Sequence, residues 1–275
     1  MDDTCTQGVL SDETVHSQIE ILNEDFLALP GTNGGNGTDT QIRFALATVD
    51  PDGNPTTGIT RDCNTTWFND NLDSEYWNEL AWDPHNYLNL YTNTAGGSRG
   101  YVPFLPAAGP VGEPHDRVVV NWQAFGPGGP FPPHADGRTA THEIGHYLGL
   151  LHPYIPIGQC GAADPPGCYQ SGDLICDTVV AEGPGDGCPI GAESCGSLDP
   201  IISYMDLTDD LCMEEFTLEQ SRRLRCTLLH YRPDLYDVVE TGPALMFDPA
   251  GLDFGEVAVG ATSAPQIATL HNDGS

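Results

Sequence analysis

Lysine is absent from this chain of 275 residues, and its nine basic residues are all arginine. Against 40 acidic residues they leave a formal net charge of −31. A surface of that charge repels nucleic acid and anionic membranes, so we expect neither as a partner. The acidic residues form either a solvated shell or, where they cluster, candidate ligands for calcium.

Long apolar runs are also missing. No stretch approaches the roughly 18 residues of a transmembrane helix, so we expect no membrane span. The segment after Met1, DDTCTQGVLSDETV, is polar and acidic and does not resemble a signal peptide. Either the chain stays inside the cell or its natural N-terminus lies further upstream. Hydrophobic residues make up 39% of the chain, which indicates a globular protein.

Pairs of cysteines spaced C-x-x-C do not occur, which argues against a zinc-finger type of site. The chain nevertheless has nine cysteines, and six of them fall between Cys160 and Cys212 in a stretch rich in Gly, Pro and Asp. Such a stretch has little apolar surface to bury, so we predict that disulfides hold it together. Disulfides indicate an oxidising compartment, and hence a secreted or cell-surface protein. The odd count leaves a free thiol, for which Cys226 is our candidate because it lies inside a helical pattern.

The order of the predicted elements, a helix, then strands, then a helix, predicts an α/β layer with the sheet on one side. Ser11 is placed to cap the first helix, and Thr217 and Gln220 have the spacing of a capping box at the start of the last one. The predicted elements are a helix over 12–29, strands over 41–49, 87–92 and 117–122, a helix from about 136–139 to 149, and a helix over 217–232.

The most informative stretch is HEIGHYLGLLH, which begins at His142. His142 and His146 are four residues apart, so a helix places both rings on one face. Glu143 can then reach a water on a shared cation without binding the cation itself. His152 lies too far along to share that face, but Gly149 can end the helix in a left-handed turn that brings the chain back.

Three neutral imidazoles and one water suit tetrahedral zinc, and they leave the full charge of the ion to acidify the water. In that site Glu143 would be the general base. The alternative is an ordinary core helix, which would leave three histidines, a glutamate and a glycine at these offsets unexplained. Its apolar face would consist of Ala140, Ile144, Tyr147, Leu148 and Leu151.

A long histidine motif followed by a methionine turn resembles the metzincin metalloproteases. SYMDLTDDLCMEEFT supplies the turn, with Met205 expected beneath the metal. Within that clan the chain looks most like the pappalysins, a group that includes bacterial ulilysin-like enzymes. The similarity covers residues 8–235 and includes SQIEILNEDF, YLNLY, GDLICDT and GCP. It implies a secreted zinc endopeptidase that acts on protein or peptide substrates.

The resemblance also implies an α+β fold, a two-lobed catalytic domain over residues 1–238. A twisted mixed sheet and the active-site helix would form the upper lobe, and a loop-rich lower lobe would hold the methionine turn and a C-terminal helix. The edge strand of the sheet, near YLNLY or GYVPF, would bind an extended substrate. Residues 239–275 resemble the first strands of Ig-like repeats of the ASPM, SPD-2 and Hydin type, and would be an incomplete β-sandwich.

Further site residues follow from the same resemblance. Asp210 would line the pocket for the residue after the scissile bond and favour cleavage before Arg or Lys, unless it is an ordinary turn aspartate. Asp173 and Thr178 would supply oxygens to a calcium ion, unless GDLICDT is a plain polar turn. The implied disulfides are Cys188–Cys212 and Cys168–Cys195, with Cys160 and Cys176 left to pair with each other and Cys5 with Cys63.

Three departures from the family pattern stand out. Leu207 occupies the position, two residues after the turn methionine, where the family usually has a tyrosine that helps bind the metal or the reacting carbonyl. Tyr204 precedes the methionine and should point elsewhere. The usual DTP ends in Val179 here. The chain also begins after the point where the first strand of the family's sheet would lie, so we expect that strand to be missing.

Two other functions compete with the peptidase. The first is a catalytically impaired metzincin relative that acts as a zinc-stabilised binding or adhesion module. Leu207 favours it, and an intact Glu143 argues against it. The second is a zinc hydrolase of another clan, which would have a third metal ligand other than His152.

Overall fold

Contacts divide the chain, in this computed structural model, into two units, Met1–Tyr236 and Asp237–Ser275. No helix within the described residues is long and apolar enough to cross a membrane. The structure describes residues 1–70, 74–109, 111–154, 157–238, 245–248 and 269–272.

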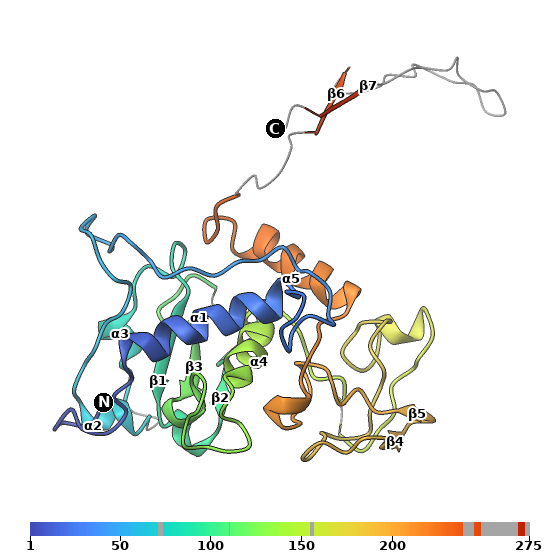
Figure 1. Ribbon diagram of the computed structural model, residues 1–275, viewed down its shortest axis with the longest axis horizontal. Coiled ribbons are helices and arrows are strands. Elements are labelled where there is room, and N and C mark those ends of the chain that lie inside the picture. The colour runs from blue at the N-terminus through green and yellow to red at the C-terminus, as the bar shows by residue number, and fades with distance from the viewer. Residues whose placement is uncertain (71–73, 110, 155–156, 239–244, 249–268, 273–275) are drawn as a thin grey trace. The chain divides into compact units, whose positions relative to one another are not determined.

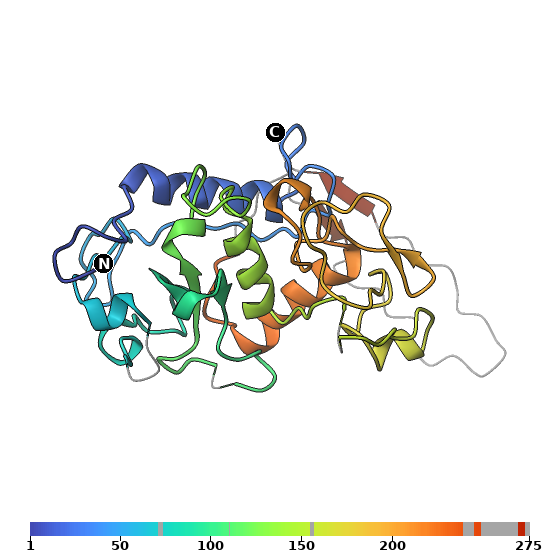
Figure 2. The ribbon, with the colours of Figure 1, turned by 90° about the horizontal axis from the view of Figure 1, so that it is seen from below.

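Helix α1 (Asp12–Phe26) lies along the first unit and packs against the motif helix, α4 (Arg138–Tyr147) (Figures 1 and 2). Ser11 caps α1 as predicted, because its side chain accepts a hydrogen bond from the backbone N–H of Thr14. The helix ends earlier than predicted, since Ala28 already has a φ of 47°. Its buried face includes Leu22 and Phe26, but also two polar residues that apolar periodicity does not select, Gln18 and Asp25.

The larger described sheet of the first unit has three strands in the order β1-β3-β2. The central strand β3 (Arg117–Asn121) is buried along its whole length, as a valine-rich strand covered on both faces should be. It pairs in parallel with β1 (Asn89–Asn93) and antiparallel with the short β2 (Gly100–Tyr101). The predicted strands over 87–92 and 117–122 are therefore confirmed, the sheet is mixed, and β2 is an edge strand of it.

The strand predicted over 41–49 is wrong. In the described structure its residues join no strand: Gln41 has a left-handed φ of 61°, and Val49 forms only an isolated bridge with Pro55. The side chain of Asn23 takes the place of a partner strand: it donates to the carbonyl of Phe44 at 3.0 Å and accepts from the N–H of Phe44 at 2.8 Å. The alternating side chains still pack as predicted, because Ile42 and Phe44 lie partly buried against the core.

Between α4 and α5 (Leu218–Tyr231) the chain forms a long region of loops and short turns. Thr217 and Gln220 form the predicted capping box at the start of α5. The remaining short elements are α2 (Thr65–Phe68), α3 (Trp77–Leu80), β4 (Glu193–Ser194) and β5 (Ser197–Leu198), and the 3-10 turns η1 (Ala95–Gly97), η2 (Trp122–Ala124), η3 (Gly167–Tyr169) and η4 (Asp210–Cys212).

Two of the four disulfides differ from the pairing that the resemblance implied. Cys168 bonds to Cys176, eight residues away, because the turn η3 folds the chain back over that short distance. Cys160 consequently bonds to Cys195, with Cα atoms 5.3 Å apart.

The other two disulfides have the expected partners, Cys5 with Cys63 and Cys188 with Cys212. Cys226 is free and exposed on α5, as predicted.

In the second unit, β6 (Leu245–Asp248) and β7 (Thr269–Asn272) pair antiparallel. The Ig-like segment expected over 239–275 otherwise lies outside the described residues.

Candidate metal centre

Helix α4 is shaped at both ends by glycines in left-handed conformations. Gly137 precedes it with a φ of 82°, and Gly149 follows it with a φ of 89°. At its C-terminal end the N–H of Gly149 donates to the carbonyl of His146, and the N–H of Leu150 donates to that of Gly145, both at 2.9 Å. These are the two bonds of a Schellman motif. They reverse the chain after α4, which is the turn that the sequence predicted for His152.

The turn brings the three histidines together. The Nε2 atoms of His142, His146 and His152 are 2.9 to 3.1 Å from one another. One point about 2 Å from all three nitrogens, the usual Zn–N distance, therefore lies just outside their plane. Within the described residues this is the single group of three or more His, Cys, Asp or Glu side chains close enough to share a metal ion.

Backbone carbonyls fix the orientation of two of these rings. The Nδ1 of His142 lies 2.7 Å from the carbonyl of Tyr204, and that of His146 lies 2.8 Å from the carbonyl of Leu150. Each carbonyl requires a proton on Nδ1, so each Nε2 presents its lone pair. The ring of His152 stacks on Tyr154, with centroids 4.8 Å apart. Sequence reasoning missed this contact, because a separation of two residues in an irregular segment does not indicate that two rings stack.

Burial keeps all three rings neutral, as metal ligands must be. It lowers the pKa of His142 and His146, and it lowers that of His152 to about 3. Proximity of the rings adds to the effect at His142 and His152, since each disfavours a charge on its neighbour. The donor set, its spacing and its protonation fit a divalent metal such as zinc.

Met205 lies against the helix turn that carries the histidines, fully buried. A Cβ atom on Gly145 would come within 2.4 Å of its sulfur, so only glycine allows this approach. The methionine therefore packs against Gly145 of α4, the residue before His146.

Glu143 is 6% exposed and has no hydrogen bond to its carboxylate among the described residues. Burial raises its pKa to about 8. It faces the edge strand β2, because a Cβ atom on Gly100 would lie 2.7 Å from its Cγ and 2.9 Å from its Oε1. The backbone of β2 and this carboxylate are therefore neighbours.

Asp210 belongs to the turn η4, and its side chain lies beside the first residues of α4. It is 2% exposed. Its Oδ2 accepts from the backbone N–H of Asp136 at 2.9 Å and of Arg138 at 3.2 Å. Its Oδ1 is 3.5 Å from His134 Nδ1 and has no hydrogen bond among the described residues. Sequence reasoning did not foresee that this carboxylate caps the motif helix, because its two donors are more than 70 residues away.

The predicted calcium ligands lie together. Thr178 Oγ1 is 2.8 and 3.0 Å from the two carboxylate oxygens of Asp173. Burial raises the pKa of Asp173 to about 6, which means that the surrounding hydrogen bonds do not fully offset the loss of water. A buried carboxylate beside a hydroxyl offers oxygens of the kind that a hard cation binds, but the carbonyls of Asp173 and Leu174 already accept hydrogen bonds from Arg223.

The structure shows the contacts of Leu207, the first departure from the family pattern, and of Tyr204. Tyr204 points away from the histidines, and its hydroxyl donates to Asp25 at 2.9 Å. The carbonyl of Leu207 accepts from Arg99, the residue before β2, at 3.2 Å.

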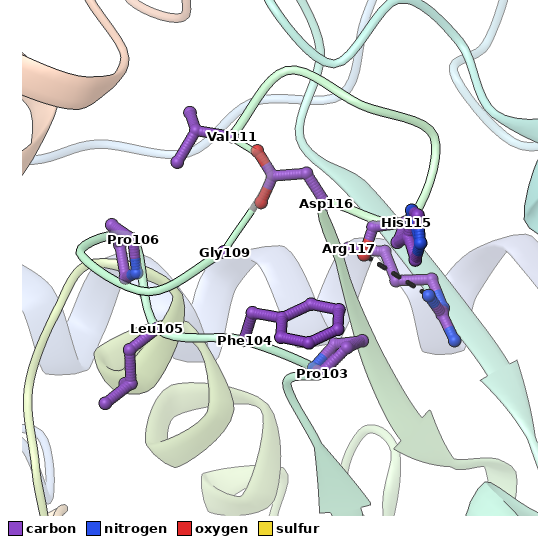
Figure 3. Close-up of a pocket in the computed structure, with 9 residues that line it drawn as sticks. All are labelled: Pro103, Phe104, Leu105, Pro106, Gly109, Val111, His115, Asp116 and Arg117. Atoms are coloured by element: carbon purple, nitrogen blue, oxygen red, sulfur yellow. Dashed lines mark hydrogen bonds between the residues drawn. The ribbon is translucent and has the colours of Figure 1, made fainter.

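A shallow hollow with no room for a water molecule lies between the loop after β2 and the start of β3 (Figure 3). Neither the three histidines nor Glu143 or Asp210 line it. The carboxylate of Asp116 in its wall is already bound by Arg232, and Arg117 donates to the carbonyl of His115. Its charged groups thus have partners within the protein, and we assign it no ligand.

Comparisons with known proteins agree with this geometry. Peptidase family M43, described as pregnancy-associated plasma protein-A, matches residues 71–229. The extracellular metalloprotease of Verticillium alfalfae is 33% identical over 237 residues, which cover 83% of this chain and 72% of the relative. Extracellular metalloprotease 1 of Coccidioides posadasii is 30% identical and covers 82% of this chain and 72% of itself. The chain belongs to the pappalysin family.

Solved structures of a pappalysin extend the likeness to the fold. Mature mirolysin of Tannerella forsythia in complex with a cleaved peptide superposes with a TM-score of 0.67 at 30% identity, over 83% of this chain and 92% of mirolysin. Mirolysin in complex with compound 9 gives a TM-score of 0.66 at 32% identity, over 80% and 85% of the two chains. The first unit is accordingly a metzincin-like α+β protease domain, and the protein is a metalloendopeptidase.

Proposed function

We propose that this pappalysin hydrolyses peptide bonds with Glu143 as general base, beside a zinc ion held by His142, His146 and His152. The single observation that carries the proposal is the triangle of Nε2 atoms 2.9 to 3.1 Å apart. When bound there, zinc lowers the pKa of a water towards about 7 and polarises the substrate carbonyl.

Glu143 moves the proton in this scheme. Its carboxylate accepts a proton from the attacking water and gives it to the departing amine. Burial alone raises its pKa to about 8, and a divalent cation next to it favours the ionised form that a base needs. The absence of hydrogen bonds to the carboxylate within the described structure leaves its oxygens available for that exchange.

We further propose that the substrate lies in extended form along β2. This strand pairs with β3 on one side, and its Gly100 lies against Glu143. A peptide added to the other side of β2 would run past the general base. Of the two segments that the sequence offered for this edge, GYVPF is the better supported.

Cleavage before arginine or lysine is the finer part of the proposal. Oδ1 of Asp210 is buried and carries no hydrogen bond among the described residues, so a basic side chain that reached it would supply the missing donor. Digestion of a peptide library, with cuts identified by mass spectrometry, tests it. Cuts that show no enrichment of Arg or Lys after the scissile bond would remove Asp210 from the pocket.

We also propose that Asp173 and Thr178 bind a calcium ion and that the protein is secreted. The buried carboxylate and the adjacent hydroxyl support calcium. Four disulfides and the extracellular relatives support an extracellular site of action.

Exchange of Glu143 for glutamine tests the central claim. Glu143→Gln keeps the shape of the side chain and removes the base, so we expect kcat on a denatured protein to fall at least about 100-fold while zinc content stays at one per chain. Glu20→Gln, an exposed position on α1, is the control. A chelator should abolish cleavage by the wild type.

Two outcomes would count against the enzyme as proposed. Undiminished cleavage by Glu143→Gln would remove its role as base. A wild-type protein that holds zinc but cleaves no substrate would instead support the impaired relative that Leu207 suggested.

A further inference from the structure

Asp25 is a buried carboxylate that neither the metal centre nor the substrate site uses directly. It lies near the end of α1 and is 1% exposed. Its Oδ2 accepts a hydrogen bond of 2.6 Å from Thr141, and its Oδ1 accepts one of 2.9 Å from the hydroxyl of Tyr204. The guanidinium of Arg138 is 3.1 Å from Oδ1. One carboxylate thus joins α1 to α4 and to the turn before Met205.

The two residues whose hydroxyls donate to Asp25 are both in direct connection with the metal ligand His142, one through the chain and one through a hydrogen bond. Thr141 precedes it on α4. Tyr204 holds it from the other side, because the carbonyl of Tyr204 lies 2.7 Å from His142 Nδ1. The side chain of Tyr204 is fully buried, with its ring 4.8 Å from that of Phe216, so its hydroxyl and its carbonyl are parts of one fixed unit. A displacement of the hydroxyl would move the carbonyl.

We propose that Asp25 is a positioning residue for His142, acting through the hydroxyls of Tyr204 and Thr141. This inference rests on the proposed zinc site. A partner that orients a ligating histidine commonly changes metal affinity 10- to 100-fold when it is removed. Here the partner is a backbone carbonyl, which no substitution can delete, and Asp25 is the group that determines where this carbonyl lies.

A purely structural role for Asp25 is the competing explanation. Its ion pair with Arg138 is buried, and a buried ion pair is by itself weak evidence for stabilisation. The two explanations differ in what they predict. A structural carboxylate affects the free energy of unfolding, whereas a positioning carboxylate also affects the affinity and geometry of the metal site in protein that is fully folded.

The test therefore measures metal binding and not activity. Asp25→Asn and Tyr204→Phe are each titrated with Zn²⁺ against a chromophoric chelator, and each is loaded with Co²⁺ to record its visible absorption spectrum. We expect both variants to bind Zn²⁺ roughly 10- to 100-fold more weakly and to show an altered Co²⁺ spectrum. The double variant should be no weaker than the weaker single one, because both changes break the same connection.

Asn23→Ala is the matched control, since Asn23 is another polar residue of α1 but bonds to Phe44 and not to α4. It should lower stability and leave Zn²⁺ affinity and the Co²⁺ spectrum unchanged. Wild-type affinity and spectrum in folded Asp25→Asn or Tyr204→Phe would overturn the inference. If Asp25→Asn does not fold, Tyr204→Phe decides the question.

His142→Ala separates a failure of this inference from a failure of the proposed function. If His142→Ala binds Zn²⁺ as tightly as the wild type, the zinc site itself is wrong and the inference falls with it. If His142→Ala loses Zn²⁺ while Asp25→Asn and Tyr204→Phe retain it, only the role of Asp25 is refuted.

Discussion

At the scale of single residues, the metal centre depends on glycines as much as on histidines. Gly149 is the clearest case, because it is needed twice. Its φ of 89° is accessible to glycine at little cost, and a Cβ atom there would lie 2.7 Å from Oγ1 of Thr227 on α5. The turn it makes carries His152 back and presents the carbonyl of Leu150 to His146.

Gly149→Ala should therefore weaken both the fold and the metal site. The left-handed conformation alone costs about 1–2 kcal/mol for alanine, and the contact with Thr227 adds to it. We expect a loss of stability larger than that figure, together with weaker Zn²⁺ binding by competition titration.

Gly53→Ala is its control, with a φ of 86° and nothing within 4 Å of the added Cβ atom. It should show the cost of the left-handed conformation alone, and wild-type Zn²⁺ affinity. Equal effects of the two substitutions on stability and on Zn²⁺ affinity would contradict the account of Gly149.

The residues that the sequence identified and those it missed differ in a physical way. The spacing of His142, Glu143, His146 and His152 is local, and helix geometry converts it into a site. The contribution of Tyr204 is a backbone carbonyl, which any residue has and which no sequence pattern can mark.

At the scale of elements, the position of α1 and its apolar face were predicted correctly, but the polar contacts that it makes were not. Its apolar face was identified from periodicity, and Leu22 and Phe26 are indeed buried. Gln18 and Asp25 lie on the same face, four residues before Leu22 and three after it. Polar residues inside an apolar stripe were the available signal, because a buried polar group must have a partner. That partner could not be named, since it lies on α4 or beyond.

The segment around Phe44 illustrates the opposite error. Alternation of apolar residues predicted a strand, and the alternation is real, but a strand also needs a neighbouring strand to bond. Asn23 supplies both bonds instead.

Asn23→Ala should therefore release this segment while the rest of the fold persists. Loss of one hydrogen bond of ordinary strength predicts a fall in protection of the Phe44 amide of roughly tenfold in hydrogen exchange. The amide of Thr40, which donates to the backbone carbonyl of Phe26 at 2.8 Å, is an internal reference that should stay protected. Unchanged exchange at Phe44 would mean that another acceptor holds the segment.

At the scale of the whole molecule, the dominant property is the net charge of −31. Like charges at that density repel one another and oppose the compact state, although salt screens the repulsion. The region between α4 and α5 has little regular structure. Three disulfides crosslink it, Cys160–Cys195, Cys168–Cys176 and Cys188–Cys212. Disulfides and bound cations would thus stabilise the folded state here, as a larger apolar core does in other proteins.

A comparison of sodium and calcium separates screening from binding at a site. Raising NaCl from about 10 mM to 150 mM should raise the melting temperature, because the screening length falls from about 30 Å to 8 Å. CaCl₂ at the same ionic strength should raise it further if Asp173 and Thr178 bind the ion, since a ligand of the native state adds stability.

Asp173→Asn should lose the excess effect of calcium and keep the effect of NaCl. Asp234→Asn makes the same change of charge at an exposed position after α5 and should keep both. If CaCl₂ and NaCl act alike on the wild type, the acidic surface is only a solvated shell and the buried carboxylate of Asp173 is satisfied by Thr178 and its backbone neighbours alone. If both variants lose the excess, calcium binds diffusely, and the stability of the molecule responds to its total charge rather than to one loop.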